Sequence, residues 1–208
     1  DQRRLIERLL VRAGISVAMA GTSRGATELF SQKRPKVILC DYDLPDGNGA
    51  KICAEVRASP DMAGTHFLLM SANERGVLVP EALDAGADDY LHIPVARDEL
   101  LARVRIGLRM WAMHEQLRRA ATTDGLTGLA NHDHFHRMLV AEFSRSRRYG
   151  RPMSLIMVDL DFFKAINDTF GHPTGNAALQ AVAKLLRDGV RECDILGRLG
   201  GEEFAVML

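Results

Sequence analysis

Hydrophobic and polar positions follow two different periods along the first half of the chain. Mostly apolar runs of strand length alternate with segments whose apolar residues recur every three or four positions, as on one face of a helix. Strands are expected at 15–19, 37–40, 67–70 and just after 89–91, and helices at 1–13, 23–31, 50–58 and 80–85. Because the central strands are apolar on both faces, the pattern predicts a doubly wound parallel sheet with helices on both sides.

Polar residues at the ends of these elements suggest a site and a cap. Ser23 is a residue type that N-caps prefer, and it opens the helix at 23–31. In parallel sheets the working site lies at the carboxyl ends of the strands. Asp41 and Ser71 follow two of the apolar strands directly, so they are candidates for such a site.

One long helix is predicted after the last strand of the sheet, over 98–122. Its apolar positions are spaced alternately by three and four residues, at Leu101, Val104, Leu108 and Trp111. The repeat is too short to establish a coiled coil. The segment 98–121 is either the last helix of the sheet domain with an extension, or a linking helix that pairs with its copy in a homodimer, which we favour.

The second half of the chain has a different order of elements. The pattern predicts helices at 134–149, from 163 and at 176–187, an apolar strand at 154–158, and short strands at 194–199 and 205–208. The last two strands flank a glycine-rich turn and form a candidate hairpin. We therefore expect an α+β domain over 122–208, distinct from the α/β domain over 1–105.

Carboxylates gather at two turns of this second domain. The glycine pair 200–201 lets another molecule approach the backbone, and Glu202 and Glu203 follow it. Asp159 ends the apolar strand, and period-two alternation puts Asp161 on the same side, although Asp161 is alternatively a cap of the next helix. If the strand pairs with the hairpin, Asp159 faces Glu202, and such oxygens suit Mg²⁺ bound to a phosphate.

Charge and composition narrow the classes of partner. Lys plus Arg equals Asp plus Glu, 27 against 27, so no net field attracts nucleic acid. No apolar run approaches the about 20 residues that span a bilayer, so no membrane partner is expected. The scattered Cys40, Cys53 and Cys193 suit free thiols in a cytoplasmic protein. Both ends of the sequence are expected to cut through a larger protein.

The second domain resembles a known family. The segments that carry the resemblance are 159–164, Asn167-Asp168, Gly171-His172, Gly175 and 200–204, with 124–131 similar to the motif that opens that family's domain. These residues resemble the GGDEF diguanylate cyclases over about 122–208. The resemblance implies a palm-like enzyme that condenses two GTP into cyclic di-GMP and pyrophosphate. His132 departs from the family, which usually has arginine there.

The resemblance also implies roles at the carboxylate turns. Asp159, the carbonyl of Leu160 and Glu202 would hold Mg²⁺ or Mn²⁺. Glu203 would bind metal or activate the attacking hydroxyl, and Lys164 would offset phosphate charge; the catalytic set is Glu202, Glu203 and Lys164. The alternative for Asp159 and Glu202 is a structural Ca²⁺ site or a surface loop.

Substrate recognition is implied for the residues after the strand. Phe162 and Phe163 would offer backbone N–H groups to phosphate, and Asn167 would read guanine. Asn176 stands where the family has aspartate, which accepts two hydrogen bonds from guanine, whereas an amide has one acceptor and one donor group. Because an amide also matches the edge of adenine, a hybrid cyclase that makes cyclic GMP-AMP is an alternative.

A short motif before the hairpin carries a further implied role. Arg191 and Asp194 match the family's RxxD site, at which cyclic di-GMP binds and inhibits; the alternative is a salt-bridged surface turn. A degenerate, non-enzymatic module that binds cyclic di-GMP through this pair is the rival from a different class.

The first domain, 1–105, resembles the receiver domain of response regulators, which is flavodoxin-like. The resemblance is carried by Asp41, Pro45, Gly49, Ser71-Ala72, 88–90 and Pro94. It implies that a cognate sensor histidine kinase phosphorylates Asp41, with Ser71 and Tyr90 as the switch residues. Ile93 replaces the family's lysine, so a receiver retained for dimer packing is the alternative.

Overall fold

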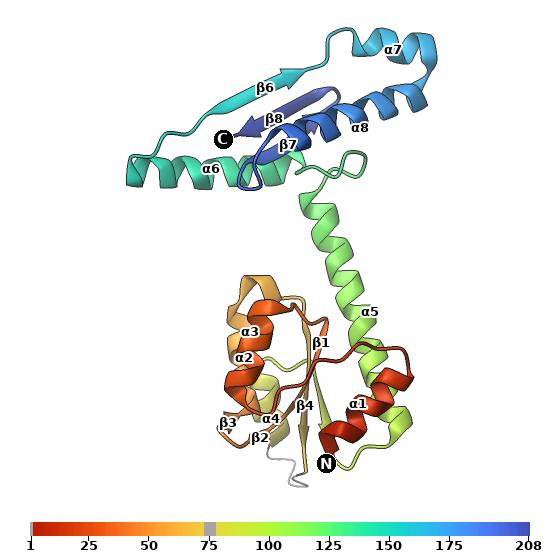
Figure 1. The fold of residues 1–208 in the computed structure, drawn as a ribbon, viewed down its shortest axis with the longest axis vertical. Coiled ribbons are helices and arrows are strands. Elements are labelled where there is room, and N and C mark those ends of the chain that lie inside the picture. Colours follow the sequence, from red (N-terminus) through yellow and green to blue (C-terminus); the bar gives the residue numbers. More distant parts are fainter. Residues whose placement is uncertain (1, 73–77) are drawn as a thin grey trace. The chain divides into compact units, whose positions relative to one another are not determined.

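The computed structural model describes residues 2–72 and 78–208 of the chain. Contacts between residues divide it into two compact units, which we call unit 1 (Asp1–Glu115) and unit 2 (Gln116–Leu208). The long helix α5 (Arg97–Thr122) extends from unit 1 into unit 2 (Figure 1). Within the described residues, no helix is both long enough and apolar enough to cross a membrane.

Unit 1 is built around a three-stranded sheet in the order β1-β4-β5. All of its pairings are parallel. Its elements are α1 (Gln2–Arg12), α2 (Ser23–Gln32), β1 (Val37–Asp41), β2 (Asp43–Leu44), β3 (Gly47–Asn48), α3 (Gly49–Ala58), η1 (Pro60–Met62), β4 (His66–Ser71), α4 (Leu78–Asp84), β5 (Asp89–His92) and the first part of α5.

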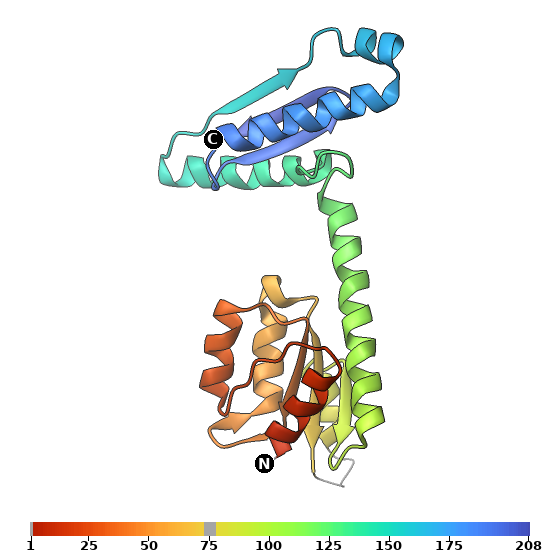
Figure 2. The same cartoon turned by 45° about the vertical axis from the view of Figure 1, so that its right-hand side comes forward.

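The sheet of unit 1 is covered by helices on both faces, as Figure 2 shows. Adjacent residues of the central strand demonstrate this, because side chains alternate between the faces of a strand. Leu69 packs in the apolar cluster shared with α2, α3 and α4, and Leu68 packs in the one shared with α1 and α5; both are 0% exposed. The predicted doubly wound parallel sheet is confirmed.

Two local predictions in unit 1 were wrong. The segment 15–19 forms no strand: Ile15 and Val17 pack against the α1–α5 cluster, but no strand of the described residues pairs with it. The N-cap of α2 is Thr22, not Ser23, because the Thr22 hydroxyl accepts the N–H of Gly25 at 3.1 Å.

The last strand of unit 1 also differs in position from the prediction. It was expected just after 89–91, whereas β5 begins at Asp89 itself. Its register pairs Tyr90 with Leu69 and His92 with Ser71. The strand is therefore aligned with the end of β4.

The apolar stripe predicted on the linking helix is turned inward. Leu101 and Val104 are 6% and 2% exposed and belong to the core of unit 1, so they are not available to a second copy. A different set on α5 is open to solvent: Ile106, Met110 and Met113 are 42%, 52% and 58% exposed.

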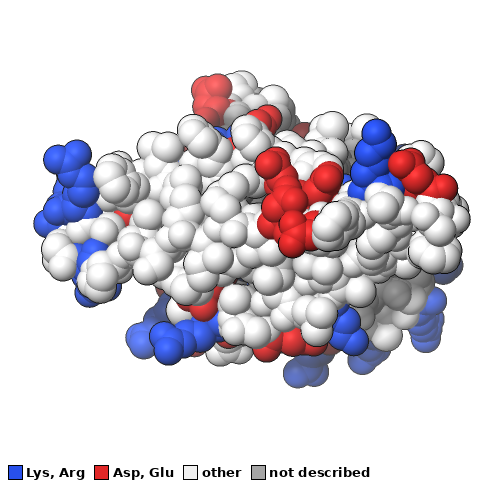
Figure 3. Space-filling view, turned by 90° about the horizontal axis from the view of Figure 1, so that it is seen from above, with Lys and Arg blue, Asp and Glu red and all other residues white. Residues whose placement is uncertain are grey.

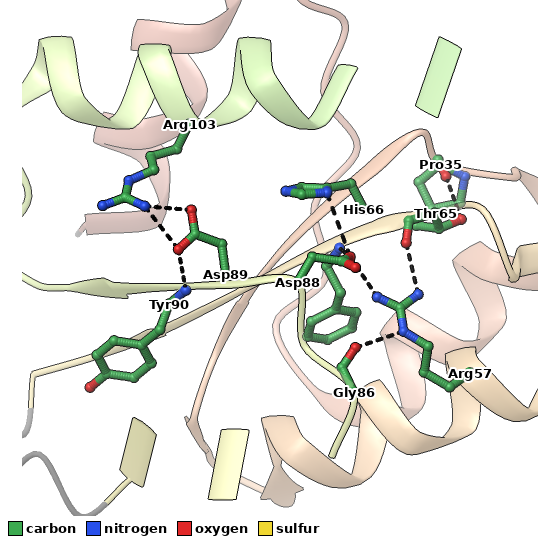
Figure 4. A network of polar contacts seen from close by, with 10 residues as sticks. Pro35, Arg57, Thr65, His66, Gly86, Asp88, Asp89, Tyr90 and Arg103 are labelled. Carbon is green, nitrogen blue, oxygen red and sulfur yellow. Dashed lines mark hydrogen bonds and ion pairs between the residues drawn. The ribbon is translucent and has the colours of Figure 1, made fainter. Parts of the chain in front are cut away.

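A polar network joins the amino-terminal ends of β4 and β5 in unit 1 (Figure 4). The guanidinium of Arg57 donates to the carbonyls of Gly86 at 2.7 Å and Thr65 at 2.8 Å, and to Asp88 Oδ2 at 2.6 Å. The same Asp88 oxygen accepts the N–H of Phe67 at 2.6 Å. One arginine thus satisfies three acceptors at the sheet edge opposite Asp41.

Unit 2 is an α+β domain around an antiparallel sheet in the order β6-β8-β7. Its elements after α5 are α6 (His132–Tyr149), β6 (Leu155–Asp159), α7 (Phe163–Phe170), α8 (His172–Gly189), β7 (Ile195–Gly200) and β8 (Glu203–Met207). The predicted class of this domain is confirmed.

The central strand β8 separates two apolar clusters in unit 2. Phe204 packs on one face with Phe163 and Leu179, and Ala205 packs on the other with Phe135. Gly197 of β7 allows α6 to approach, because a Cβ there would lie 2.6 Å from the ring of Phe135. The outer strand β6 is different, since its apolar side chains are largely exposed.

Candidate functional site

The pairing of β6 with β8 brings together the two turns that carry carboxylates. Asp159, the last residue of β6, is the register partner of Glu203, the first residue of β8. Directly opposed residues of antiparallel strands have Cα atoms about 4.5–5.5 Å apart. The predicted facing of Asp159 and Glu202 is therefore shifted by one residue, and Glu202 lies next to the pair in the turn of the hairpin.

Asp161 does not take either of its predicted places. The strand ends at Asp159, so period-two alternation does not extend to Asp161, which lies in a turn. The N-cap of α7 is Phe162, which makes no side-chain capping bond. Phe162 has a φ of 59° and is 84% exposed. This left-handed conformation is uncommon for an aromatic residue and marks a sharp turn into α7.

The start of α7 places a backbone hydrogen bond and an exposed lysine close in sequence to Asp159. Phe163 is buried in the core, and its N–H donates to the carbonyl of Leu160 at 3.3 Å. A carbonyl oxygen has two lone pairs, so Leu160 keeps one for another ligand. Lys164 follows on the same turn and is exposed.

The two residues predicted to contact guanine lie at the packing contact between α7 and α8. Gly175 is buried, and a Cβ there would collide with the side-chain oxygen of Asn167 and lie 3.2 Å from the ring of Phe163. The glycine thus lets the half-buried Asn167 side chain press against α8. Asn176 is the next residue of α8 and is exposed, so the two asparagines come from adjoining parts of α7 and α8.

The segment from Arg191 to Asp194 is a closed turn. The N–H of Arg191 donates to Asp194 Oδ2 at 2.8 Å, and the N–H of Asp194 donates to the carbonyl of Arg191 at 3.1 Å. Within 2–72 and 78–208, the guanidinium of Arg191 forms no ion pair with Asp194 or another carboxylate. The turn is therefore held by the carboxylate of Asp194 and by one backbone hydrogen bond, and the arginine side chain is exposed to solvent.

Sequence reasoning missed an arginine that holds the hairpin tip. Arg198 donates from Nε and Nη2 to the carbonyl of Gly201, at 3.0 and 2.7 Å. Its Nη1 donates to both carboxylate oxygens of Asp124 at 3.2 Å. Both side chains are largely buried, 14% and 23% exposed. The available signal was a charged residue inside a predicted strand, which needs a buried partner.

Asp124 is further fixed by its own turn. Its Oδ1 accepts the N–H of Thr127 at 2.8 Å and the Thr127 hydroxyl at 2.6 Å. Burial raises the pKa of Asp124, but the hydrogen bonds from Thr127 and the charge of Arg198 outweigh it, so the net pKa is lowered. The ionised carboxylate therefore links the turn at 124–127, through Arg198, to the tip of the β7–β8 hairpin.

Unit 1 places its candidate residues at the carboxyl edge of the parallel sheet. Asp41 ends β1 and is the register partner of Met70, so it lies one residue from Ser71 on the adjacent strand. Asp41 is half-buried and its Oδ1 accepts the N–H of Asp43 at 3.2 Å, while Ser71 is 0% exposed. Open parallel sheets carry their sites at this edge, outside the carboxyl ends of the strands.

The neighbouring strand β5 fixes Tyr90 and shows the effect of Ile93. The N–H of Tyr90 donates to Asp89 Oδ1 at 2.8 Å, and that carboxylate is bound by Arg103 at 2.7 Å (Figure 4). Ile93 is 6% exposed and packs with the α1–α5 cluster. The position of the family's lysine therefore serves the core and offers no cation to Asp41.

The donor set of unit 2 suits a hard divalent ion. Asp159, Glu203 and the adjacent Glu202 supply carboxylate oxygens, and Mg²⁺ needs only one or two of these besides water and phosphate. Among the described residues, no three His, Cys, Asp or Glu side chains are grouped closely enough to hold a metal by themselves. Figure 3 shows one prominent group of acidic side chains near the middle of the face it presents, smaller acidic groups elsewhere on that face, and basic side chains to one side of the central group.

Comparison with known families gives two adjoining matches. Residues 1–105 match the response regulator receiver domain, and residues 121–208 match the diguanylate cyclase GGDEF domain. The chain therefore belongs to the response regulator receiver family, and a GGDEF domain follows its receiver domain.

Individual relatives agree with this assignment. The response regulator PleD of Caulobacter vibrioides is 37% identical over 169 residues, which cover 77% of this chain and 37% of PleD. The probable diguanylate cyclase DgcC of Escherichia coli is 44% identical over 88 residues, which cover 42% of this chain and 24% of DgcC. The match thus spans about a third of the length of PleD and about a quarter of the length of DgcC.

A solved structure supports the fold of the receiver domain. A putative response regulator from Chloroflexus aurantiacus has 29% sequence identity and a TM-score of 0.50, and the match covers 51% of this chain and 88% of that one.

The ion pair of Asp124 predicts a pH-dependent stability. A carboxyl group whose folded pKa is lowered stabilises the fold above its unfolded pKa of about 3.9, and this stabilisation is lost as the pH falls through the folded pKa. Asp124→Asn should therefore destabilise unit 2 by about 2 kcal/mol near neutral pH, and the difference from wild type should shrink toward about pH 3.

Urea unfolding monitored by circular dichroism at several pH values measures this difference. Glu142→Gln is the matched control, because its ion pair with Arg145 is exposed on α6 and contributes little. A difference between Asp124→Asn and wild type that stays constant down to about pH 3 would contradict the assignment.

Proposed function

We propose that this protein is a two-component response regulator whose GGDEF domain condenses two GTP molecules into cyclic di-GMP and pyrophosphate. The observation that carries the proposal is the β6–β8 register, because it sets Asp159 opposite Glu203 and beside Glu202 in a domain that matches the diguanylate cyclases. In this proposal, Asp41 and Ser71 at the carboxyl edge of the unit 1 sheet regulate the cyclase domain.

The carboxylates of unit 2 perform the chemistry in this proposal. Asp159, the second lone pair of the Leu160 carbonyl and Glu202 would hold Mg²⁺ or Mn²⁺, which offsets phosphate charge and acidifies the attacking hydroxyl when bound. Glu203, opposite Asp159, accepts the proton of the 3′-hydroxyl of one GTP, which attacks the α-phosphate of the other. Lys164 holds the triphosphate as a point charge.

Glycine and amide residues between α7 and α8 recognise the base. Asn167, pressed against Gly175, offers its amide next to that of Asn176. The backbone N–H of Phe162, just before α7, would donate to phosphate oxygens. That of Phe163 already donates to the carbonyl of Leu160 at 3.3 Å, so a phosphate would have to share it.

Regulation involves three further features of the chain. Phosphoryl transfer from the cognate histidine kinase goes to Asp41, and Ser71 and Tyr90 are the switch residues that respond to the phosphoryl group. If acetyl phosphate still labels Asp41→Asn, Asp41 is not the phosphoacceptor.

The exposed guanidinium of Arg191 and the Asp194 turn bind cyclic di-GMP as an inhibitor, which equilibrium binding to Arg191→Ala tests. The buried Ile93 favours the alternative in which the receiver chiefly supports the dimer.

A homodimer brings two GTP-loaded domains together in this reaction. The exposed apolar residues Ile106, Met110 and Met113 of α5 are spaced by four and three residues, as on one helical stripe. We assign the pairing surface to this stripe in place of Leu101 and Val104. Sedimentation of Met110→Glu as a dimer indistinguishable from wild type would remove the assignment.

Glu203→Gln should reduce pyrophosphate release from GTP by about 100-fold or more, because a general base contributes that much to a rate. The measurement uses the full-length protein with Mg²⁺. Asp188→Asn, an exposed carboxylate at the end of α8, is the control and should keep the wild-type rate. If the wild-type protein releases no pyrophosphate but binds cyclic di-GMP, the domain is a degenerate, non-enzymatic module that binds cyclic di-GMP, and the proposed enzymatic function is wrong.

Asn176 favours a second candidate function, a hybrid cyclase that makes cyclic GMP-AMP. Its exposed amide complements the N1 and N6 edge of adenine and offers guanine one acceptor in place of two. With equimolar ATP and GTP, wild type should give some mixed product, and Asn176→Asp should shift selectivity toward GTP by about tenfold. Mass spectrometry of the products decides: pure cyclic di-GMP from wild type eliminates the hybrid activity.

A further inference from the structure

Two histidines lie one helical turn apart at the start of α6. His132 and His136 share a face of the helix, because residues four apart are neighbours on its surface. Both are exposed. Their rings are nearly parallel, at 12°, with centroids 6.4 Å apart. The proposed cyclase reaction uses neither residue.

A carboxylate beside the first histidine sets its tautomer. His132 Nδ1 lies 3.1 Å from Asp133 Oδ1. Where the carboxylate accepts this bond, Nδ1 is the donor, and the lone pair of a neutral ring is then on Nε2. A histidine whose other ring nitrogen donates to a carboxylate is the usual arrangement around metal-bound imidazole.

We propose that His132 and His136 form a binding site for a divalent transition-metal ion such as Zn²⁺. Imidazole nitrogen suits Zn²⁺, Cu²⁺ and Ni²⁺, whereas Mg²⁺ prefers oxygen. The protein supplies two ligands, and water fills the remaining positions, since the described residues contain no group of three metal-binding side chains. Turning the exposed rings until both Nε2 atoms reach one ion takes only side-chain rotation, which is fast at a surface.

The place of this site in the fold gives it a structural consequence. Asn131 precedes His132 and is the N-cap of α6, where its Oδ1 accepts the N–H of His134 at 2.9 Å. Its Nδ2 donates to the carbonyl of Ala120 on α5 at 3.4 Å. A metal held by His132 and His136 bridges the first turn of α6 directly after this cap. Because the ion binds only the helical arrangement, it stabilises that turn.

The test is calorimetric titration of the untagged full-length protein with ZnCl₂ alone, near neutral pH and with excess Mg²⁺ to occupy the carboxylate site. All variants carry Cys193→Ser, because that exposed thiol would compete for the ion. His136→Ala should raise the Kd for Zn²⁺ about tenfold or more, and Asp133→Asn should raise it less. His134→Ala, two residues away on another side of the helix, is the matched control and should bind like the parent.

Thermal unfolding provides a second readout that does not depend on activity. Zn²⁺ should raise the Tm of the parent and of His134→Ala, but not that of His136→Ala. Equal Zn²⁺ affinity in His134→Ala and His136→Ala, or a parent that does not bind Zn²⁺, overturns the proposal. Neither result bears on pyrophosphate release, so the cyclase assignment and the metal site stand or fall separately.

Discussion

The arrangement of unit 2 depends on the pairing of β8 with both of its neighbours. Its side chains belong to two cores, with Phe204 and Ala205 each 0% exposed on opposite faces. A one-residue slip in the register of β8 would turn Phe204 and Ala205 to the opposite faces of the sheet. Both apolar clusters would then be lost, so the register is strongly specified. The same register places Glu203 opposite Asp159. The packing of apolar residues therefore fixes the strand register, and the register holds these carboxylates close together although like charges repel each other.

Much of this arrangement could be predicted from the sequence, because it follows from local patterns. Apolar runs gave the strands β1, β4 and β6, and helical periodicity gave α6 and α8, within a few residues of their ends. Placing Asp41 and Ser71 at one sheet edge needed only the rule that parallel strands end together. These features depend on period and on topology, both of which the residue order contains.

The features that escaped prediction depend on partners distant in sequence. The segment 15–19 alternates like a strand but has no strand beside it among the described residues, and a ladder requires two members. Leu101 and Val104 have coiled-coil spacing, yet the sheet of unit 1 already covers them. The contact between Arg198 and Asp124 spans 74 positions, and no periodicity announces it. In each case a tertiary contact overrides a local signal.

The contact of Arg198 also bears on which cation binds the substrate in the proposed reaction. Its three donor nitrogens are already engaged by Gly201 and Asp124, and breaking these bonds to bind phosphate would leave Asp124 largely buried and unpaired, which is costly. Lys164, exposed on the first turn of α7, makes no ion pair within the described part of the chain. The hairpin thus uses its arginine to hold its own tip, and in the proposed reaction the exposed lysine is the cation assigned to the triphosphate.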